Sequence, residues 1–291
     1  MTVSKKTAVL MATATAFIWG LSFLSIKVAV AVVPPMSLGL VRFVIASVLL
    51  FALFAVKRTL PRLAWRDLPL MAGAGLVGVT LYFLGENNGI LRLSASESSI
   101  IVGTIPVLTT MADRLFAGTR MSAAQVGGAV LSALGIGLMV VESMRLSPEP
   151  LGYLFMGVAA LSWVAYAFMT KPLFKRYGRT EITFWQSAFG ALGFLPFALA
   201  ETMPWELVSA GVVLNVLYLG IFCSALGYLM YITSLDVLGA GVSSVFINLI
   251  PVVSVAASFV LLGERLSLLQ LAGGAVAVAG VYLAGLAKNP Q

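Results

Sequence analysis

The chain has no histidine, and only one of its 291 residues is a cysteine. The missing histidine excludes a histidine-based catalytic triad, an HExxH metalloprotease motif and a histidine proton relay. The single cysteine, Cys223, cannot form a disulfide within the chain and provides no thiolate cluster for a metal. We therefore expect neither a metal nor another cofactor.

Charged residues are also scarce. They make up 10% of the chain, against about 25% in a soluble domain, while 60% of the residues are apolar. So few charges could not cover the apolar surface of a soluble protein, and apolar runs long enough to cross about 30 Å of hydrocarbon recur throughout. The basic residues that give a net charge of +7 lie in short loops between these runs. This pattern favours a lipid bilayer over nucleic acid as the partner.

The apolar runs predict an all-α integral membrane protein with ten transmembrane helices and no separate extramembrane domain. The first run is too long for a signal peptide, so we expect it to be retained as a helix. Proline and glycine clusters mark the breaks between runs. The predicted helices span residues 7–30, 36–56, 68–91, 95–115, 122–141, 150–171, 180–200, 207–234, 240–262 and 267–287.

The second half of the chain repeats the first. At an offset of 145 residues, the segment from Ser98 to Pro106 matches the segment from Ser243 to Pro251. Each half holds about five predicted helices, and an odd number of crossings reverses the direction of the second copy. Residues 1–146 and 147–291 are therefore predicted to form two inverted five-helix repeats within one transmembrane domain. This architecture is typical of alternating-access transporters, whose site lies between the repeats.

Basic residues are unevenly divided between the two sides. With the N-terminus inside, thirteen lysines and arginines fall on the inner side and three on the outer side. This bias predicts a multi-pass protein of the bacterial inner membrane with both termini in the cytoplasm. The inner residues are Lys5, Lys6, Lys57, Arg58, Arg62, Arg66, Arg114, Arg120, Lys171, Lys175, Arg176, Arg179 and Lys288, and the outer ones are Arg92, Arg145 and Arg265.

Charges within the predicted helices are costly, at about 2.5–3.5 kcal/mol each on insertion scales. Glu86 stands out, because it follows Tyr82 by one helical turn and precedes Asn87. It could be solvated near the outer interface, pair with Lys27 or Arg42, bind a substrate ammonium or carry a coupling proton. Arg42 and Lys27 also have structural explanations, namely snorkelling and the interaction of a cation with a helix C-terminus.

Other polar and aromatic residues recur at equivalent places in the two halves. Pro106 and Pro251 each free a carbonyl four residues upstream, so we expect them to kink their helices. Nearby hydroxyls and amides could line a cavity or could join helices to one another. Aromatic rings could supply the apolar part of a pocket, or could simply pack or face lipid. The candidates for substrate binding are Trp19, Ser22, Tyr82, Glu86, Asn87, Ser98, Ser99, Trp163, Tyr166, Tyr228, Ser244 and Asn248.

The last predicted helix of each half differs from the others. Residues 122–141 and 267–287 have almost nothing polar in their middles but several glycines, including Gly135 and Gly280. Small residues allow close approach of helix backbones. We interpret these two helices as scaffold away from the substrate.

Four motifs occur in order along the chain: Trp19-Gly20 with Lys27, Pro35 with Arg42-Phe43, the serine-rich helix ending at Pro251, and Leu262-Gly263-Glu264-Arg265-Leu266 with Gln270 and Gly273. Together these motifs resemble the drug/metabolite transporter (DMT) superfamily, EamA type, over residues 8 to 286. The resemblance implies ten helices in two inverted repeats, a central cavity lined by the first four helices of each repeat, and export of small metabolites. Within the superfamily, the chain resembles the bacterial aromatic amino-acid exporters of YddG type.

Two departures from the pattern matter. The first repeat has Thr119 where the second has Glu264, so one loop has lost its acid. Small multidrug exporters of the superfamily bind cations through a glutamate in their first helix, and the first predicted helix here has no acid. The resemblance therefore disfavours export of cationic drugs.

Our hypothesis is a secondary transporter that exports amino acids, or similar small zwitterionic metabolites, by alternating access. The alternative is an exchanger of sugar phosphates or other anions, which would need Lys27 and Arg42 to face the cavity. We do not expect an enzyme, because the sequence offers no buried aspartate pair, no nucleophile with a histidine and no metal cluster. A scaffold subunit without flux is the remaining alternative. The expected partners are a small-molecule substrate and the bilayer, with the chain a monomer or homodimer.

Overall fold

The computed structural model describes residues 3–93, 95–112, 122–141, 149–262 and 267–286, and these residues form helices and connecting turns without a β-strand. The boundary predicted between residues 146 and 147 lies outside the described residues. So do several residues used above, namely Arg114, Thr119, Arg120, Arg145, Gly263, Glu264, Arg265 and Lys288.

The first half begins with two uninterrupted helices and continues with broken ones. Pro35 stands at the first position of the second helix, where its missing N–H costs nothing. The third helical run changes from 3-10 to α to π and back to α without a loop. The elements are α1 (Lys5–Val30), α2 (Pro35–Val56), η1 (Trp65–Asp67), α3 (Leu68–Gly75), η2 (Leu76–Leu81), α4 (Tyr82–Arg92), α5 (Ala95–Val102), α6 (Ile105–Ala112) and α7 (Ala123–Val141).

The second half follows the same plan. Its third run again passes through a π-helical segment, and its fourth run is again interrupted. The elements are α8 (Pro150–Thr170), η4 (Lys171–Lys175), α9 (Arg179–Ala198), η5 (Trp205–Leu207), α10 (Ala210–Tyr218), η6 (Leu219–Gly227), α11 (Tyr228–Leu238), α12 (Ala240–Val245), η7 (Phe246–Asn248), α13 (Leu249–Leu262) and α14 (Leu268–Leu286).

Helices lie at each of the predicted ranges, with ends that differ by a few residues; the third run, for example, begins at Trp65 rather than at residue 68. Within the described residues, six helical runs are long and apolar enough to cross a membrane. The ranges 123–135 and 271–280 are shorter apolar helices. The six long runs are 5–30, 35–56, 65–92, 150–175, 210–238 and 240–257.

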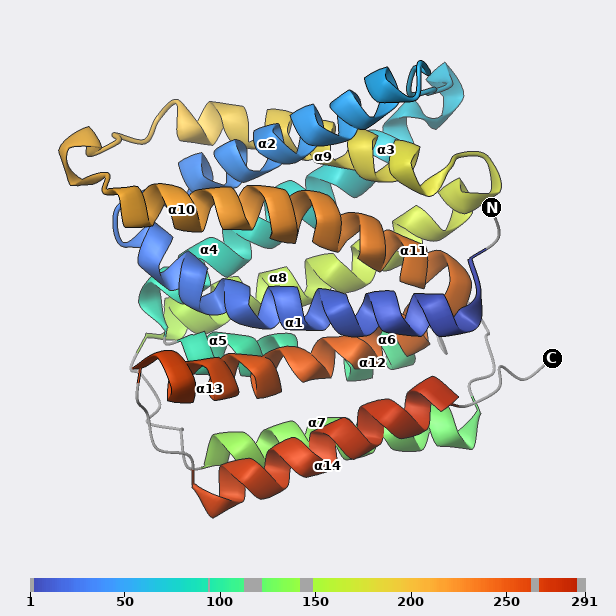
Figure 1. Ribbon diagram of the computed structural model, residues 1–291, viewed down its shortest axis with the longest axis vertical. Helices are drawn as coiled ribbons and strands as arrows, with labels where there is room; N and C mark the ends of the chain where they lie inside the picture. The colour runs from blue at the N-terminus through green and yellow to red at the C-terminus, as the bar shows by residue number, and fades with distance from the viewer. Residues whose placement is uncertain (1–2, 94, 113–121, 142–148, 263–266, 287–291) are drawn as a thin grey trace.

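The helices lie roughly parallel or antiparallel in a stack (Figure 1). The pair α2 and α9 forms one edge of the stack, the pair α7 and α14 forms the other, and α1 and α8 lie between them. The start of α1 and the end of α14 lie at the same end of the bundle, which we call the N-terminal end. The loop between α9 and α10 lies at the opposite, far end.

The pair α7 and α14 packs backbone against backbone. A β-carbon at Gly135 would overlap the backbone nitrogen of Ala277, and one at Gly280 would overlap that of Ser132. The two glycines are equivalent in the repeat, so the same close approach occurs on both helices. Only glycine fits at these crossings, so the close approach expected from the small residues of these helices is present.

The helices that contain Pro106 and Pro251 are interrupted one turn before each proline. Residues 103 and 104 separate α5 from α6, and the 3-10 turn η7 separates α12 from α13. A proline cannot donate to the carbonyl four residues back, so the chain changes its hydrogen-bonding pattern at that point. The interruptions therefore follow from the sequence in both halves.

Candidate functional site

A small closed cavity lies where the two halves meet. Its volume is about 20 Å³, which is room for about one water molecule. Pockets that hold small ligands are larger, at about 300–1,000 Å³. In this structure the cavity is therefore too small to hold an amino acid or another small metabolite. Its wall consists of Trp19, Ser22, Phe23, Arg42, Tyr82, Phe83 and Glu86 from the first half and Trp163, Tyr228 and Ile250 from the second.

The cavity is deep within the helices. At 1.5 Å per residue, Trp19 is about 17 Å from the far end of α1, near the middle of this helix. Arg42 and Glu86 are about 10 Å and 9 Å from the far ends of α2 and α4. The charged groups thus lie between the centre of the bundle and its far end.

Aromatic rings surround the cavity on most sides. The ring centroids of Trp19 and Trp163 are 5.2 Å apart in an edge-to-face arrangement, and Tyr82 lies 4.9 Å from Trp163. Tyr228 lies 5.5 Å from Trp19 and 5.7 Å from Trp163, also edge to face. These are favourable distances for aromatic pairs. We call Trp19, Tyr82, Trp163 and Tyr228 the aromatic cage.

Hydrogen bonds fix the orientation of the cage rings. The Trp19 indole donates to the carbonyl of Cys223 at 3.0 Å, and the Trp163 indole donates to the Tyr231 hydroxyl at 3.0 Å. The Tyr228 hydroxyl donates to the carbonyl of Gly78 at 3.0 Å. Two of these three bonds cross between the halves, so the cage depends on how the halves are placed relative to one another.

The π-helical segment η2 brings Gly78 into this arrangement. Segments of π-helix are uncommon and occur often at functional sites. A β-carbon at Gly78 would overlap the ring of Tyr166, so only glycine lets that ring approach. Tyr166 is fully buried and donates to Gln186 Oε1 at 2.9 Å, while Gln186 donates to Thr170 at 3.0 Å. Tyr166 therefore lies behind the cage, where it supports Trp163 at a ring distance of 5.4 Å.

Glu86 is the acidic group of the cavity. Its side chain is buried, and Oε1 accepts a hydrogen bond from the Tyr82 hydroxyl at 2.7 Å. The two residues are one turn apart on α4, so the helix itself positions the pair. A carboxylate among aromatic faces can bind an ammonium group, because both the charge and the ring faces attract a cation.

Arg42 is the basic group of the same cavity and is only 2% exposed. Its guanidinium lies 4.3 Å from the centre of the Phe83 ring, and Nε donates to Ser224 Oγ at 3.3 Å. No ion pair within 4 Å joins Arg42 to Glu86 in the described part of the chain. The cavity thus holds one positive and one negative side chain that do not contact each other directly.

Six of the predicted binding residues, Tyr166 among them, lie away from the cavity wall, although all are buried. Asn87 donates to the carbonyl of Pro35 at 2.8 Å, and Ser244 donates to that of Gly241 at 2.9 Å. Both amide atoms of Asn248 and the hydroxyl of Ser98 lack hydrogen-bond partners within the described ranges. Ser98, Ser99, Ser244 and Asn248 lie on the interrupted helical runs and not on the cavity wall.

Lys27 is also outside the cavity wall. Its ammonium donates to the carbonyls of Ile90 at 2.7 Å and Leu93 at 2.8 Å. These carbonyls end α4, where a cation interacts favourably with the helix dipole. Lys27 thus joins α1 to the far end of α4. The helix C-terminus that it stabilises is that of α4 and not that of its own helix.

The N-terminal end of the bundle is closed by charged contacts. Asp67 forms an ion pair with Arg176 and accepts a hydrogen bond from the Tyr177 hydroxyl at 2.7 Å. Burial raises the pKa of the Tyr177 phenol above its ordinary value, so it remains a donor at neutral pH. Arg179 contacts Asp236 at 2.6 Å. These pairs connect η1 to the turn after η4, and α9 to α11.

The far end is closed by a carboxylate that caps a helix. Glu201 accepts hydrogen bonds from the backbone N–H groups of Met36 at 3.0 Å and Ser37 at 2.7 Å, at the start of α2. The free N–H groups and the dipole of a helix N-terminus favour a negative charge there. The loop after α9 is thereby fixed to α2.

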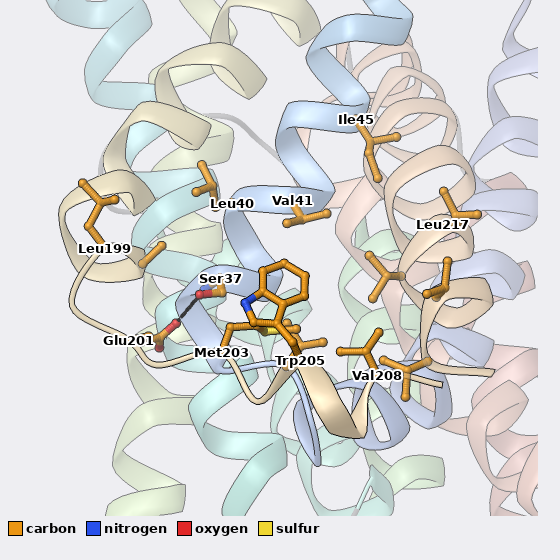
Figure 2. Close-up of a pocket in the computed structure, with 15 residues that line it drawn as sticks. Ser37, Leu40, Val41, Ile45, Leu199, Glu201, Met203, Trp205, Val208 and Leu217 are labelled. Carbon is orange, nitrogen blue, oxygen red and sulfur yellow. Dashed lines mark hydrogen bonds between the residues drawn. The ribbon is translucent and has the colours of Figure 1, made fainter. Parts of the chain in front are cut away.

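A second, larger hollow lies beside this cap, between α2 and α10 (Figure 2). Its volume is about 520 Å³, and its wall is almost entirely apolar. The Ser37 hydroxyl donates to Glu201 at 2.8 Å, so the polar side chains of the groove already bind each other. Trp205, which is 75% exposed, lies among the apolar side chains. The groove lacks the convergent polar groups that a zwitterion needs, and the central cavity is the better candidate.

The described residues contain no group of three or more Cys, Asp or Glu side chains that could hold a metal ion. The cavity's chemistry is that of a binding site: aromatic rings, one carboxylate, one guanidinium, and the hydroxyls of one serine and two tyrosines. A small cavity lined by aromatic rings and a few polar groups, set between two repeated halves of apolar helices, is typical of a membrane transporter.

Comparison with known proteins agrees with this class. The model of the EamA-like transporter family matches residues 6–141 and 150–286. The chain belongs to this family, within the drug/metabolite transporter superfamily, which indicates a multi-pass membrane transporter. The family predicted from the sequence motifs is confirmed.

Individual relatives support the same class. An uncharacterized transporter of Archaeoglobus fulgidus is 30% identical over 96% of this chain and 98% of its own. A probable terminal-alkyne amino-acid exporter of Streptantibioticus cattleyicolor is 29% identical over 91% of this chain and 89% of its own. One crystal structure aligns with 97% of this chain and 98% of its own at a TM-score of 0.79; at 21% identity it shows the fold alone.

Several wall and supporting residues were not among the predicted candidates. Phe23, Phe83 and Ile250 line the cavity, and Ser224 and Gln186 hold Arg42 and Tyr166. Phe83 could have been suggested by its position beside Tyr82. Ser224 lies in an apolar run 182 residues from Arg42, and only the fold brings the two together.

Proposed function

We propose that the chain exports amino acids, or similar small zwitterionic metabolites, across the bacterial inner membrane by alternating access. The substrate binds in an enlarged form of the central cavity. The aromatic cage holds its apolar part, and Glu86 binds its ammonium group. The observation that carries this proposal is the convergence of Glu86 and the cage on one cavity shared by both halves.

Two further points support an amino acid as the substrate. The Streptantibioticus cattleyicolor relative is named a probable exporter of amino acids and aligns with most of this chain. The four cage rings offer large apolar faces, which suit an apolar or aromatic side chain. The buried hydroxyls and amide at Ser98, Ser99, Ser244 and Asn248 lie on the two interrupted helical runs and would contact substrate when the cavity widens toward them.

The transport path requires ten crossings in two inverted five-helix repeats, divided at residues 146 and 147, with both termini in the cytoplasm. In that topology the charged pairs at the N-terminal end close the cytoplasmic side, and Glu201 with Lys27 closes the outer side. Opening either set in turn would expose the cavity to one side at a time. Accessibility labelling should place residues 57–66 and 172–179 on the same, cytoplasmic face. Labelling of these two loops from opposite faces would contradict the inverted repeat.

The test of function is counterflow in proteoliposomes. Vesicles preloaded with each of the twenty amino acids, or with common phosphorylated metabolites, are diluted into a trace of the same labelled compound. We expect saturable accumulation of one or more apolar amino acids, and at least a tenfold loss of it in Glu86→Gln. Absence of saturable flux for every amino acid would remove the substrate assignment.

The second candidate is exchange of sugar phosphates or other anions, and the presence of Arg42 on the cavity wall favours it. Glu86 opposes it, because a carboxylate in the same small cavity repels an anion. Lys27, the other predicted cation, binds backbone carbonyls instead. An anion exchanger would show flux of phosphorylated metabolites that increases in Glu86→Gln, whereas an amino-acid exporter would lose flux.

A further inference from the structure

Arg42 carries a charge that the protein alone does not satisfy. It is buried deep in α2, and its Nη1 has no hydrogen-bond partner within the described residues. Burying a guanidinium is costly unless its N–H groups find hydrogen-bond partners. At such a depth this cost suggests a role that a neutral side chain could not fill.

The contacts of Arg42 hold the guanidinium in place but leave part of it unused. The Phe83 ring lies 4.3 Å from Cζ, and Ser224 Oγ is 3.3 Å from Nε. The N–H groups of a guanidinium lie in its plane, and a pair of them matches the two oxygens of a carboxylate. Phe83 and Ser224 thus support the group from α4 and η6, while the N–H group at Nη1 keeps its hydrogen-bonding capacity for another molecule.

Arg42 and Glu86 line the same cavity without forming a direct ion pair. Two opposite charges that neutralised each other would be expected in contact. Because no direct ion pair joins them, both groups can instead bind a molecule that carries both charges, as an amino acid does. The aromatic cage lies beside them, where the side chain of that molecule would be placed.

We propose that Arg42 binds the carboxylate of the substrate, so that Arg42 and Glu86 together select a zwitterion. This proposal rests on the proposed function and adds the group that recognises the acid end of the cargo. Ser224 is a positioning residue, since it reaches the substrate only through Arg42. When the cavity widens, the Arg42 guanidinium and the Glu86 carboxylate must remain on opposite sides of the α-carbon of the bound substrate.

The test measures binding, independently of flux, by quenching of tryptophan fluorescence in purified protein. The probes are L-phenylalanine, phenethylamine, which lacks the carboxylate, and 3-phenylpropanoate, which lacks the ammonium. If counterflow selects another amino acid, its own amine and acid are used as well. Wild type should bind L-phenylalanine at least tenfold more tightly than either analogue.

The variants then assign the two ends. Arg42→Gln should weaken binding of L-phenylalanine and 3-phenylpropanoate by about 10- to 100-fold, as expected for a lost charge-assisted hydrogen bond, and change phenethylamine less than about threefold. Glu86→Gln should instead weaken binding of phenethylamine and leave binding of 3-phenylpropanoate little changed. Ser224→Ala should weaken binding of L-phenylalanine and 3-phenylpropanoate by a few-fold and leave binding of phenethylamine unchanged. Arg92→Gln, which removes a cation outside the cavity, is the matched control and should change none of the three.

Three outcomes would overturn the proposal. In the first, wild type binds L-phenylalanine and phenethylamine with equal affinity. In the second, it binds none of the probes. In the third, Arg42→Gln loses affinity for all three probes equally. If Arg42→Gln does not fold, the comparison of the three probes in wild type still decides. Amino-acid flux that does not depend on Arg42 would refute this inference alone. Arg42-dependent binding of 3-phenylpropanoate without any amino-acid flux would refute only the proposed function.

Discussion

The central cavity and the α7–α14 pair are both built from repeated elements, yet they are held together in opposite ways. In the pair, Gly135 and Gly280 let two backbones touch, so no side chain separates the helices. Around the cavity, large rings fill the space between the halves, and single hydrogen bonds such as that from Trp19 to Cys223 orient them.

This difference indicates which part of the bundle can move. Two helices whose backbones interlock cannot slide without collision, because main-chain atoms cannot rotate away. Rings joined across the halves by one hydrogen bond each can separate at the cost of those bonds, and a substrate can replace the lost contacts. We therefore expect α7 and α14 to remain fixed while the cavity opens.

The largest expected effect comes from breaking the fixed region. Gly135→Val would place a side chain against the backbone of Ala277. We expect a loss of about 3 kcal/mol or more in stability, at the upper end for overpacked cores, since backbone cannot yield as a side chain does. The measurement is thermal unfolding of the purified protein, followed by its tryptophan fluorescence.

Gly137 on the same helix provides the matched control, because a β-carbon there would meet nothing within 4 Å. Gly137→Ala should leave the melting temperature unchanged or slightly raised, as alanine favours the helix. Equal melting temperatures for Gly135→Val and Gly137→Ala would show that the two helices do not interlock.

A second prediction concerns the cage. Trp163→Phe removes part of the ring surface and leaves the Tyr231 hydroxyl without its indole donor. We expect binding of L-phenylalanine to weaken about tenfold, the equivalent of about 1.4 kcal/mol. The measurement is an equilibrium binding titration of the purified variant with labelled L-phenylalanine.

Trp185→Phe is the control for this prediction. Trp185 also donates a hydrogen bond, to the carbonyl of Arg62, but it lies outside the cavity wall. Its variant should bind as wild type does. A similar loss of affinity in both variants would mean that tryptophan replacement acts through general loosening of the bundle.

Much of this comparison could be read from the sequence. Hydropathy and proline positions gave the helical ranges, and the offset of 145 residues identified Gly135 with Gly280 and the paired interruptions before Pro106 and Pro251. Trp19 and Glu86 were predicted site residues because rings and an acid at membrane depth are unusual, and both line the cavity.

The rest depended on contacts between distant residues. A serine in a membrane helix can face a cavity or bond to a backbone, and periodicity does not distinguish the two. Ser22 lines the cavity while Ser98 and Ser244 do not. Lys27 was expected near the end of α1, but its partners are carbonyls more than sixty residues away. The support of Arg42 by Ser224 likewise arises only when α2 packs against η6.

A smaller effect is expected at the far end of the bundle. Glu201→Gln keeps an acceptor for the start of α2 but removes the negative charge from its N-terminus. The expected loss is about 0.5–1 kcal/mol of stability, the usual contribution of a charge at a helix end. Thermal unfolding should show a decrease in melting temperature relative to wild type, and this decrease should become smaller in high salt. Glu206→Gln, an exposed acid on the same loop, is the control and should show no decrease.

The smallest expected effect tests whether contacts at the N-terminal end of the bundle break when the cavity opens. Arg179 and Asp236 are 25% and 28% exposed, so their ion pair contributes at most about 1 kcal/mol. Asp236→Asn should therefore shift an open–closed equilibrium by no more than about fivefold. The readout is the rate at which a maleimide modifies Ser22→Cys on the cavity wall, in a Cys223→Ala background.

Salt distinguishes a true closure from general loosening. If the pair closes the path, salt should speed the modification in the parent protein, and Asp236→Asn should be fast already and nearly insensitive to salt. Glu206→Gln, at the far end, should behave as the parent does. If maleimide modifies the Asp236→Asn variant as slowly as the parent at every salt concentration, this ion pair does not limit access to the cavity. Closure of the N-terminal end would then depend on the better-buried Asp67 and its partners Arg176 and Tyr177.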